Sequence, residues 1–160
     1  MRRLAALIVA AALAGCAQMQ AGAETGNRHE GYYYPTVSST EFYKPRAQAL
    51  EDSDRARRLG FVAVMLAQQL ELPYPPSYML FAKGDQAEKM IIIGLGEDFD
   101  TIYRARAHMA ALTTIARQSP LFQDLGTEES FTFYDLAEML GFREIVLSDG
   151  KTYAHRIRLR

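Results

Sequence analysis

Apolar and polar residues alternate along this chain with two different periods, which predict helices in some segments and strands in others. A helix is predicted to begin at Asp52 or Ser53, and from Leu59 to Leu70 it carries apolar side chains on almost every side, so we expect it to be buried and to end before Pro73. A second helix, capped by Asp98 or Asp100, is predicted where apolar residues follow one helical stripe. That stripe consists of Ile102, Ala105, Met109, Leu112 and Ala116.

Two pairs of segments have the pattern of β-hairpins. Residues 78–83 and 89–95 flank the turn sequence GDQAE, and the second arm is a continuous apolar run typical of a central strand. Alternation on both sides of Asp149-Gly150 predicts a second hairpin with a two-residue turn. That turn would place Glu144 opposite His155 on the neighbouring strand.

Two shorter elements complete the pattern. Residues 40–47 alternate and contain Pro45, which is tolerated in a strand at the edge of a sheet. Thr132 and Asp135 have the spacing of a capping box, and Gly141 follows where a helix ends in the left-handed conformation. A short helix is therefore expected between Thr132 and Gly141.

Together these elements predict an α+β fold in a single domain. We expect a mixed, mostly antiparallel sheet built from two hairpins and an edge strand, because tight turns join most of the strands. Two longer helices and one short helix would pack on one face of that sheet. The order of the strands in the sheet does not follow from the pattern.

The beginning of the chain has a different character. Arg2 and Arg3 precede an apolar run over residues 4–13, which is shorter than the roughly 20 residues that span a bilayer. The sequence Leu13-Ala14-Gly15-Cys16 follows, and Cys16 is the only cysteine of the chain. These residues resemble the lipobox of bacterial lipoproteins, in which the cysteine receives a diacylglycerol and the chain is cut just before it.

The lipobox resemblance implies three parts of the chain. Residues 1–15 would be a signal peptide, residues 16–28 a lipidated N-terminus with a small, polar tether, and residues 29–160 the folded domain. Ala17 resembles the sorting signal for the outer membrane, so we expect a lipid-anchored, exported protein on the periplasmic face of that membrane. An ordinary secretory leader with an incidental cysteine is the alternative interpretation.

Charge and cysteine content restrict the partners. Without Arg2 and Arg3 the 18 basic residues become 16 against 19 acidic ones, a formal charge of −3. A mildly acidic domain disfavours nucleic acid as a partner. If Cys16 is acylated, the mature chain has no free thiol, which excludes disulfides and cysteine nucleophiles. The bilayer, reached through acylated Cys16, is the one partner that the leader implies.

A run of tyrosines is the most unusual surface feature. Tyr32, Tyr33 and Tyr34 follow each other in HEGYYYP, which we interpret as an extended segment with Tyr32 and Tyr34 on one face. Aromatic rings with a polar tip suit binding to a protein or cell-wall partner, and Tyr74 is a further candidate for this surface. The alternative is that one face of the segment packs onto the core.

Glu144 and His155 form the candidate polar pair. They would serve as a general acid and base if they lined a cleft, although a simple cross-strand ion pair is the more ordinary interpretation. The histidines lack the spacing of a metal site, and the loop around Gly94 and Gly96 lacks the residues of a phosphate loop. The spacing reveals no serine, histidine and acid set, and no cofactor or metal is expected.

The body of the chain, from RHEGYYYP to AHRIRL, resembles small exported bacterial proteins. Some similar sequences carry a molybdopterin-guanine dinucleotide biosynthesis label, but that cytoplasmic chemistry needs a phosphate-binding loop, and this chain has an export leader instead. The first hypothesis is a non-enzymatic, membrane-tethered binding or structural module of the cell envelope. The alternative is a small-ligand binding or hydrolytic periplasmic domain that uses a cleft at Glu144 and His155.

Overall fold

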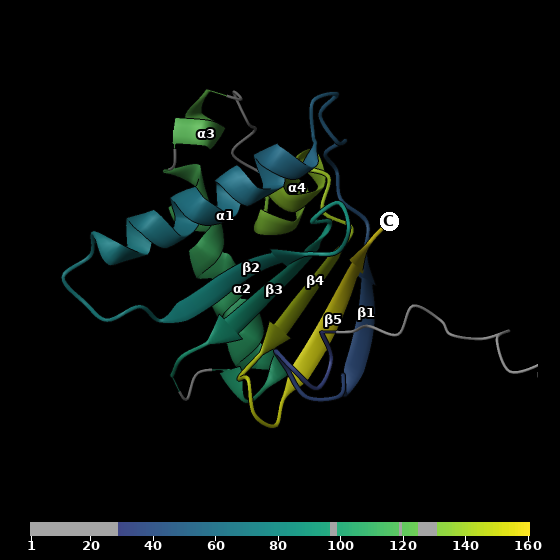
Figure 1. Ribbon diagram of the computed structural model, residues 1–160, viewed down its shortest axis with the longest axis vertical. Helices are drawn as coiled ribbons and strands as arrows, with labels where there is room; N and C mark the ends of the chain where they lie inside the picture. The colour runs from purple at the N-terminus through teal and green to yellow at the C-terminus, as the bar shows by residue number, and fades with distance from the viewer. Residues whose placement is uncertain (1–28, 97–98, 119, 125–130) are drawn as a thin grey trace, which may run out of the picture.

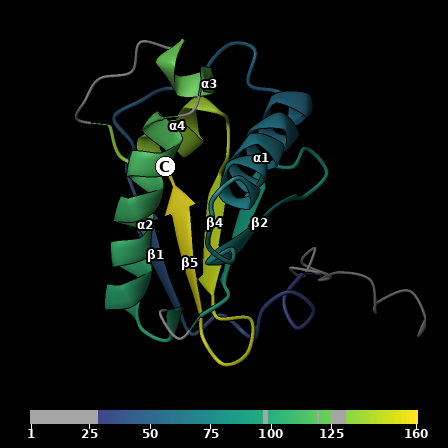
Figure 2. The same cartoon turned by 90° about the vertical axis from the view of Figure 1, so that its left-hand side faces the viewer.

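The computed structural model describes residues 29–96, 99–118, 120–124 and 131–160. They form a five-stranded sheet with all helices on one face (Figures 1 and 2). The helices are α1 (Arg55–Leu70), α2 (Ile102–Arg117), α3 (Pro120–Gln123) and α4 (Phe133–Met139). The strands are β1 (Ser39–Tyr43), β2 (Tyr78–Lys83), β3 (Lys89–Gly94), β4 (Glu144–Ser148) and β5 (Ala154–Leu159). The predicted single α+β domain is confirmed.

The strand order is β1-β5-β4-β3-β2, so β1 and β2 are the two edges. Within each hairpin the strands pair antiparallel, β2 with β3 and β4 with β5. The two hairpins meet through a parallel pair, β3 with β4, and β1 adds to β5 in parallel. The sequence predicts the edge position of β1, which ends at Tyr43, before Pro45.

The helix ends follow local hydrogen bonding. The side chain of Asp54 caps α1 and that of Thr101 caps α2, so the N-caps lie one to three residues from the positions that the sequence predicts. The capping box of α4 forms as predicted between Thr132 and Asp135. Gly141 has the expected positive φ of 75° after that helix. Helix α3 was not expected from the sequence.

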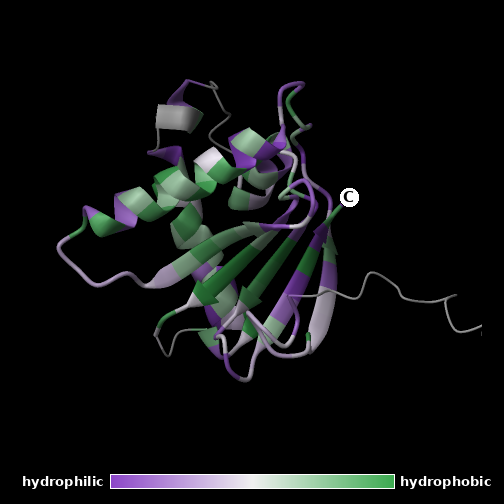
Figure 3. Ribbon diagram, viewed as in Figure 1, coloured by the Kyte–Doolittle hydropathy of each residue, from purple (hydrophilic) through white to green (hydrophobic). Residues whose placement is uncertain are grey.

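Two groups of buried side chains lie on opposite faces of the sheet. The larger core fills the space between the sheet and the helices, with Phe61, Met65 and Leu112 among its fully buried members. A smaller cluster on the other face joins Tyr34 to Ile91, Val146 and Ala154. Figure 3 shows why both faces are partly apolar: β3 and β4 are mostly hydrophobic, whereas hydrophilic and hydrophobic residues alternate in β5.

The second hairpin differs from its prediction. Ser148 pairs with Ala154, so residues 149–153 form the loop, and Glu144 pairs with Arg158. The Asp149 carboxylate accepts hydrogen bonds from the N–H groups of the loop and thereby stabilises a wider turn than two residues. The predicted pairing of Glu144 with His155 is therefore wrong by three residues. An odd shift turns every later side chain to the other face of the sheet.

Candidate functional site

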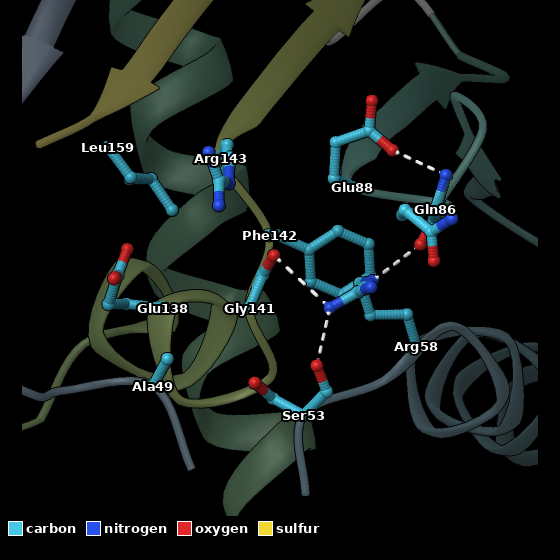
Figure 4. Close-up of a pocket in the computed structure, with 10 residues that line it drawn as sticks. All are labelled: Ala49, Ser53, Arg58, Gln86, Glu88, Glu138, Gly141, Phe142, Arg143 and Leu159. Atoms are coloured by element: carbon cyan, nitrogen blue, oxygen red, sulfur yellow. Dashed lines mark hydrogen bonds between the residues drawn. The ribbon is translucent and has the colours of Figure 1, made fainter. Parts of the chain in front are cut away.

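A cavity of about 690 Å³ lies where the beginning of α1, the β2–β3 turn and the α4–β4 connection meet (Figure 4). Its walls combine charged, polar and apolar side chains. They are Ala49, Ser53, Arg58, Gln86, Glu88, Glu138, Gly141, Phe142, Arg143 and Leu159.

Arg58 is the central residue of this cavity and is only 5% exposed. Its guanidinium donates hydrogen bonds to four backbone carbonyls that come from three separate segments. Nε donates to Gln86 O at 2.9 Å, and Nη1 donates to the carbonyls of Ser53, Leu140 and Gly141 at 3.0, 3.1 and 3.3 Å. These contacts fix the plane of the guanidinium and join the first turn of α1 to the end of α4.

The second terminal nitrogen of Arg58, Nη2, makes no hydrogen bond to a described residue and is not fully buried, and Arg58 lines the cavity. None of the four carbonyls that hold Arg58 carries a formal charge. The site therefore contains a buried positive charge with two free N–H donors, which is the arrangement that suits a carboxylate.

Three further charged side chains surround the same cavity. Arg143 is exposed and adds a second guanidinium, while Glu88 and Glu138 add carboxylates. Burial raises the pKa of Glu138 above its usual value, and the positive charge of Arg143 opposes that rise only in part. The cavity thus presents both signs of charge to a ligand.

A second polar cluster lies at the edge of the sheet, on its helix-covered face. The Ser39 side-chain oxygen lies 2.7 Å from Nδ1 of His155, whose other ring nitrogen, Nε2, lies 3.3 Å from Oε1 of Glu41. Arg106 on α2 donates to the other oxygen of Glu41 at 2.7 Å. Burial alone would raise the pKa of Glu41, but the hydrogen bond from Arg106 and the close contact with His155 outweigh it and hold that pKa below its usual value.

A groove of about 630 Å³ begins at Glu41 and runs between β1, α2 and α4. The rings of Tyr43 and Tyr134 pack in it with centroids 4.4 Å apart. Burial, assisted by the negative charge of Glu41, raises the pKa of Tyr134 to about 12. The apolar lining of the groove includes Met109, Ala110 and Phe131.

The tyrosine run is not the extended segment that the sequence analysis predicts. Residues 29–34 form a turn, in which Gly31 has a φ of 83° and donates to the carbonyl of Tyr34 at 2.7 Å. Tyr34 is buried against the open face of the sheet, and Tyr33 packs on Phe81. Tyr32 is 81% exposed and its ring packs edge-on against that of Tyr33, with centroids 4.9 Å apart, so the structure keeps Tyr32 and Tyr33 together and buries Tyr34 away from them.

Tyr74 does not join those rings. It is exposed in the loop between α1 and β2, which Figure 1 shows on the far side of the molecule from residues 29–34. The predicted combination of Tyr74 with the tyrosine run is therefore wrong.

Glu144 and His155 do not form a pair. Glu144 lies on the open face of β4, within 3.4 to 3.8 Å of Lys89, Arg156 and Arg158. His155 pairs in register with Leu147 and points to the helix-covered face, where it meets Ser39 and Glu41. The shifted hairpin register explains why the proposed acid and base pair is wrong.

Sequence reasoning missed both polar clusters for different reasons. Arg58 has a detectable signal, because it lies on the same helical stripe as Phe61, Val62 and Met65, where a charged residue must be buried. Ser39 and His155 are 116 residues apart and meet only through the parallel pairing of β1 with β5. No local spacing contains that information.

No protein-family model, curated protein or solved structure matches this chain. In the part of the chain that the structure describes, no helix combines the length and hydropathy needed to cross a membrane. The same residues contain no group of three or more potential metal ligands. Cys16 and its lipobox lie outside the described residues.

Proposed function

We propose that this chain is a cell-envelope lipoprotein whose folded domain is a membrane-tethered binding module. Acylated Cys16 would anchor it on the periplasmic face of the outer membrane, and residues 17–28 would connect the anchor to the domain. The leader supports this proposal through its basic start, apolar run and lipobox. Several acyl chains hold a protein stably on a bilayer, because each buried methylene contributes about 0.8 kcal/mol.

The open Nη2 of Arg58 is the observation that supports a binding function best. Burying a guanidinium is costly unless its donors find partners, and two donors of Arg58 have none among the residues that the structure describes. A carboxylate that enters the cavity would accept from these donors and would also meet the guanidinium of Arg143.

The carboxylates of Glu88 and Glu138 define the rest of the ligand. A simple anion would be repelled by them, whereas an ammonium group on the same ligand would be attracted. We therefore assign to this cavity a zwitterionic ligand, an amino acid or a short peptide. In the envelope, such groups occur at the ends of partner proteins and on cell-wall peptides.

Calorimetric titration of the mature, detergent-solubilised protein tests the ligand class. The probes are dialanine, its N-acetyl derivative, which lacks the ammonium, and its amide, which lacks the carboxylate. We expect dialanine to bind most tightly, the acetylated peptide to bind at least tenfold more weakly and the amide not to bind. Equal binding of dialanine and its amide, or no binding of any probe, contradicts the assignment.

A matched pair of variants tests the location. Arg143→Gln removes an exposed guanidinium at the cavity and should weaken dialanine binding about tenfold or more, since one charge-assisted hydrogen bond contributes roughly 1.5 to 3 kcal/mol. Lys151→Gln removes an exposed cation in the β4–β5 loop, which does not line this cavity, and should leave binding unchanged. Equal effects of the two variants would exclude this cavity as the site.

Metabolic labelling with an alkyne-bearing fatty acid tests the anchor. The natural chain should incorporate the label and fractionate with outer membranes, and Cys16→Ser should abolish both results. Label retained in Cys16→Ser would contradict the lipoprotein assignment without affecting the cavity.

A further inference from the structure

The cluster of Ser39, His155 and Glu41 has the connectivity of an activated serine. Nδ1 of the imidazole lies within hydrogen-bond distance of the Ser39 hydroxyl, whereas Nε2 makes no hydrogen bond to a described residue and faces the Glu41 carboxylate at 3.3 Å. The negative charge of this carboxylate favours the neutral tautomer in which Nε2 carries the proton, so that Nδ1 holds the lone pair. The Ser39 hydroxyl therefore donates to Nδ1, which is the direction that a general base requires.

The backbone explains why these three groups fit together. Ser39 and Glu41 are two residues apart on β1, so they lie on the same face about 6.6 Å apart along the strand. His155 lies opposite Ser39 on β5, and its ring reaches from one side chain to the other. His155 is 3% exposed and is held in place, whereas Ser39 is exposed to solvent.

The solvent-exposed edge at Ser39, together with a groove that Glu41 lines two residues further along β1, provides room for a substrate. β1 is the edge of the sheet, so its outward-facing N–H groups have no strand partner among the described residues and are available to an oxyanion. The groove that begins at Glu41 is lined by Tyr43, Met109 and Phe131, which suit an apolar acyl chain.

We propose that Ser39 is the nucleophile of an acyl-transfer site that hydrolyses esters of apolar acyl groups, with His155 as its general base and Glu41 as the residue that orients His155. This activity goes beyond ligand binding in the Arg58 cavity and does not depend on it. The site was missed in the sequence because its members come from β1 and β5.

The reaction balances without a cofactor. The Ser39 oxygen forms a bond to the ester carbonyl carbon while its proton passes to Nδ1 of His155. The bond from that carbon to the alcohol oxygen then breaks, and the alcohol leaves with the proton. Water, deprotonated by His155, attacks the acyl-serine in the same way, which releases the carboxylic acid and restores the Ser39 hydroxyl.

A fluorophosphonate probe tests the nucleophile directly, because a serine oxygen displaces its fluoride and forms a stable phosphonyl ester. We expect intact-mass measurement of the mature protein to show one adduct, and peptide mapping to place it on Ser39. Ser39→Ala should abolish the adduct. Ser38→Ala is the matched control, since the Ser38 hydroxyl donates to the carbonyl of Ala154 whereas the hydroxyl at His155 Nδ1 is that of Ser39; it should label at the natural rate.

The roles of the other two residues have separate readouts. His155→Gln should slow labelling and the hydrolysis of 4-nitrophenyl butyrate at least 100-fold, because general-base catalysis contributes about 10² to 10⁴ in rate. Glu41→Gln should slow labelling and hydrolysis, and it should also change the pH dependence of the hydrolysis rate. A purely structural role of Glu41 would leave that pH dependence unchanged. Circular dichroism confirms that each variant is folded. Absence of an adduct on the folded natural chain, an adduct retained in Ser39→Ala, or an undiminished rate in His155→Gln would overturn the proposal.

Discussion

The α-carbon of Gly141 faces the guanidinium of Arg58 so closely that an added Cβ would lie 2.5 Å from Nη1. Gly141 also has a φ of 75°, in the region that favours glycine. One residue thus ends α4 and makes room for the buried arginine of the cavity. The requirement for glycine is both conformational and steric at this position.

Gly141→Ala should therefore destabilise the fold by about 2 to 4 kcal/mol, since a left-handed non-glycine residue and an overpacked contact each carry a cost. Gly60→Ala is the matched control, because Gly60 lies inside α1 with no atom within 4 Å of an added Cβ. It should stabilise the protein by about 0.5 to 1 kcal/mol. Urea unfolding of both variants measures the difference, and changes of the same sign would contradict this account.

Tyr34 and Tyr32 offer a second matched pair. Tyr34 is 2% exposed and belongs to the smaller apolar cluster, whereas Tyr32 is 81% exposed. Tyr34→Ala should cost about 3 to 5 kcal/mol, because it leaves a large cavity on the open face of the sheet. Tyr32→Ala should change the free energy of unfolding by less than about 0.5 kcal/mol. Equal losses in thermal or urea unfolding would show that the turn of residues 29–34 is packed differently.

The sequence predicts the elements of this fold well because they depend on local patterns. The apolar stripe of α2, the capping box of Thr132 and Asp135 and the left-handed Gly141 are all determined within a few residues. The strand order depends on pairing between distant segments. The parallel contacts of β3 with β4 and of β1 with β5 therefore leave no local trace.

The candidate sites were harder to predict for the same reason. The tyrosine run suggested a surface, but Gly31 turns the chain and sends Tyr34 into the molecule. The predicted pairing of Glu144 with His155 assumed a two-residue turn. The carboxylate of Asp149 instead stabilises a longer loop. A register error of three residues was enough to place the two side chains on opposite faces.

Alkaline pH should weaken the fold through buried tyrosines. Burial, together with the charge of Glu41, raises the pKa of Tyr134 to about 12 from the value of 10.0 for a free tyrosine. The contribution of Tyr134 is complete below pH 10 and is lost as the pH rises from 10 towards 12, because the unfolded chain ionises first. The free energy of unfolding lost through Tyr134 between pH 9 and pH 11 amounts to about 1 kcal/mol.

Urea unfolding at pH 9 and pH 11 measures that loss. Tyr134→Phe removes the ionisable group and should reduce the pH dependence between these two values. Burial also raises the pKa of Tyr78 to about 12 and raises that of Tyr153, so part of the dependence should remain in Tyr134→Phe and should decrease further when Tyr78→Phe is added. If the free energy of unfolding depended on pH equally in the natural chain and in both variants, Tyr134 and Tyr78 would not be the groups responsible.

Acid pH should weaken the fold at the β4–β5 loop. Burial alone would raise the pKa of Asp149, but hydrogen bonds from the N–H groups of Lys151, Tyr153 and Thr152, and from the Thr152 hydroxyl, lower it to about 2. A lowered pKa in the folded state means that the stabilisation is complete above pH 4 and is lost as the pH falls from 4 towards 2, because the unfolded chain takes up the proton first. The same hydrogen bonds set the register that carries His155 to Ser39.

Two substitutions separate the charge of Asp149 from its hydrogen bonds. Asp149→Asn keeps one acceptor oxygen and should retain most of the stability at pH 7, but it should reduce the loss between pH 4 and pH 2. Asp149→Ala removes all four hydrogen bonds and should cost about 1 to 3 kcal/mol at pH 7. Urea unfolding across this pH range distinguishes them. If Asp149→Ala proved as stable as the natural chain, the loop would not depend on this carboxylate, and the register of β4 and β5 would need another cause.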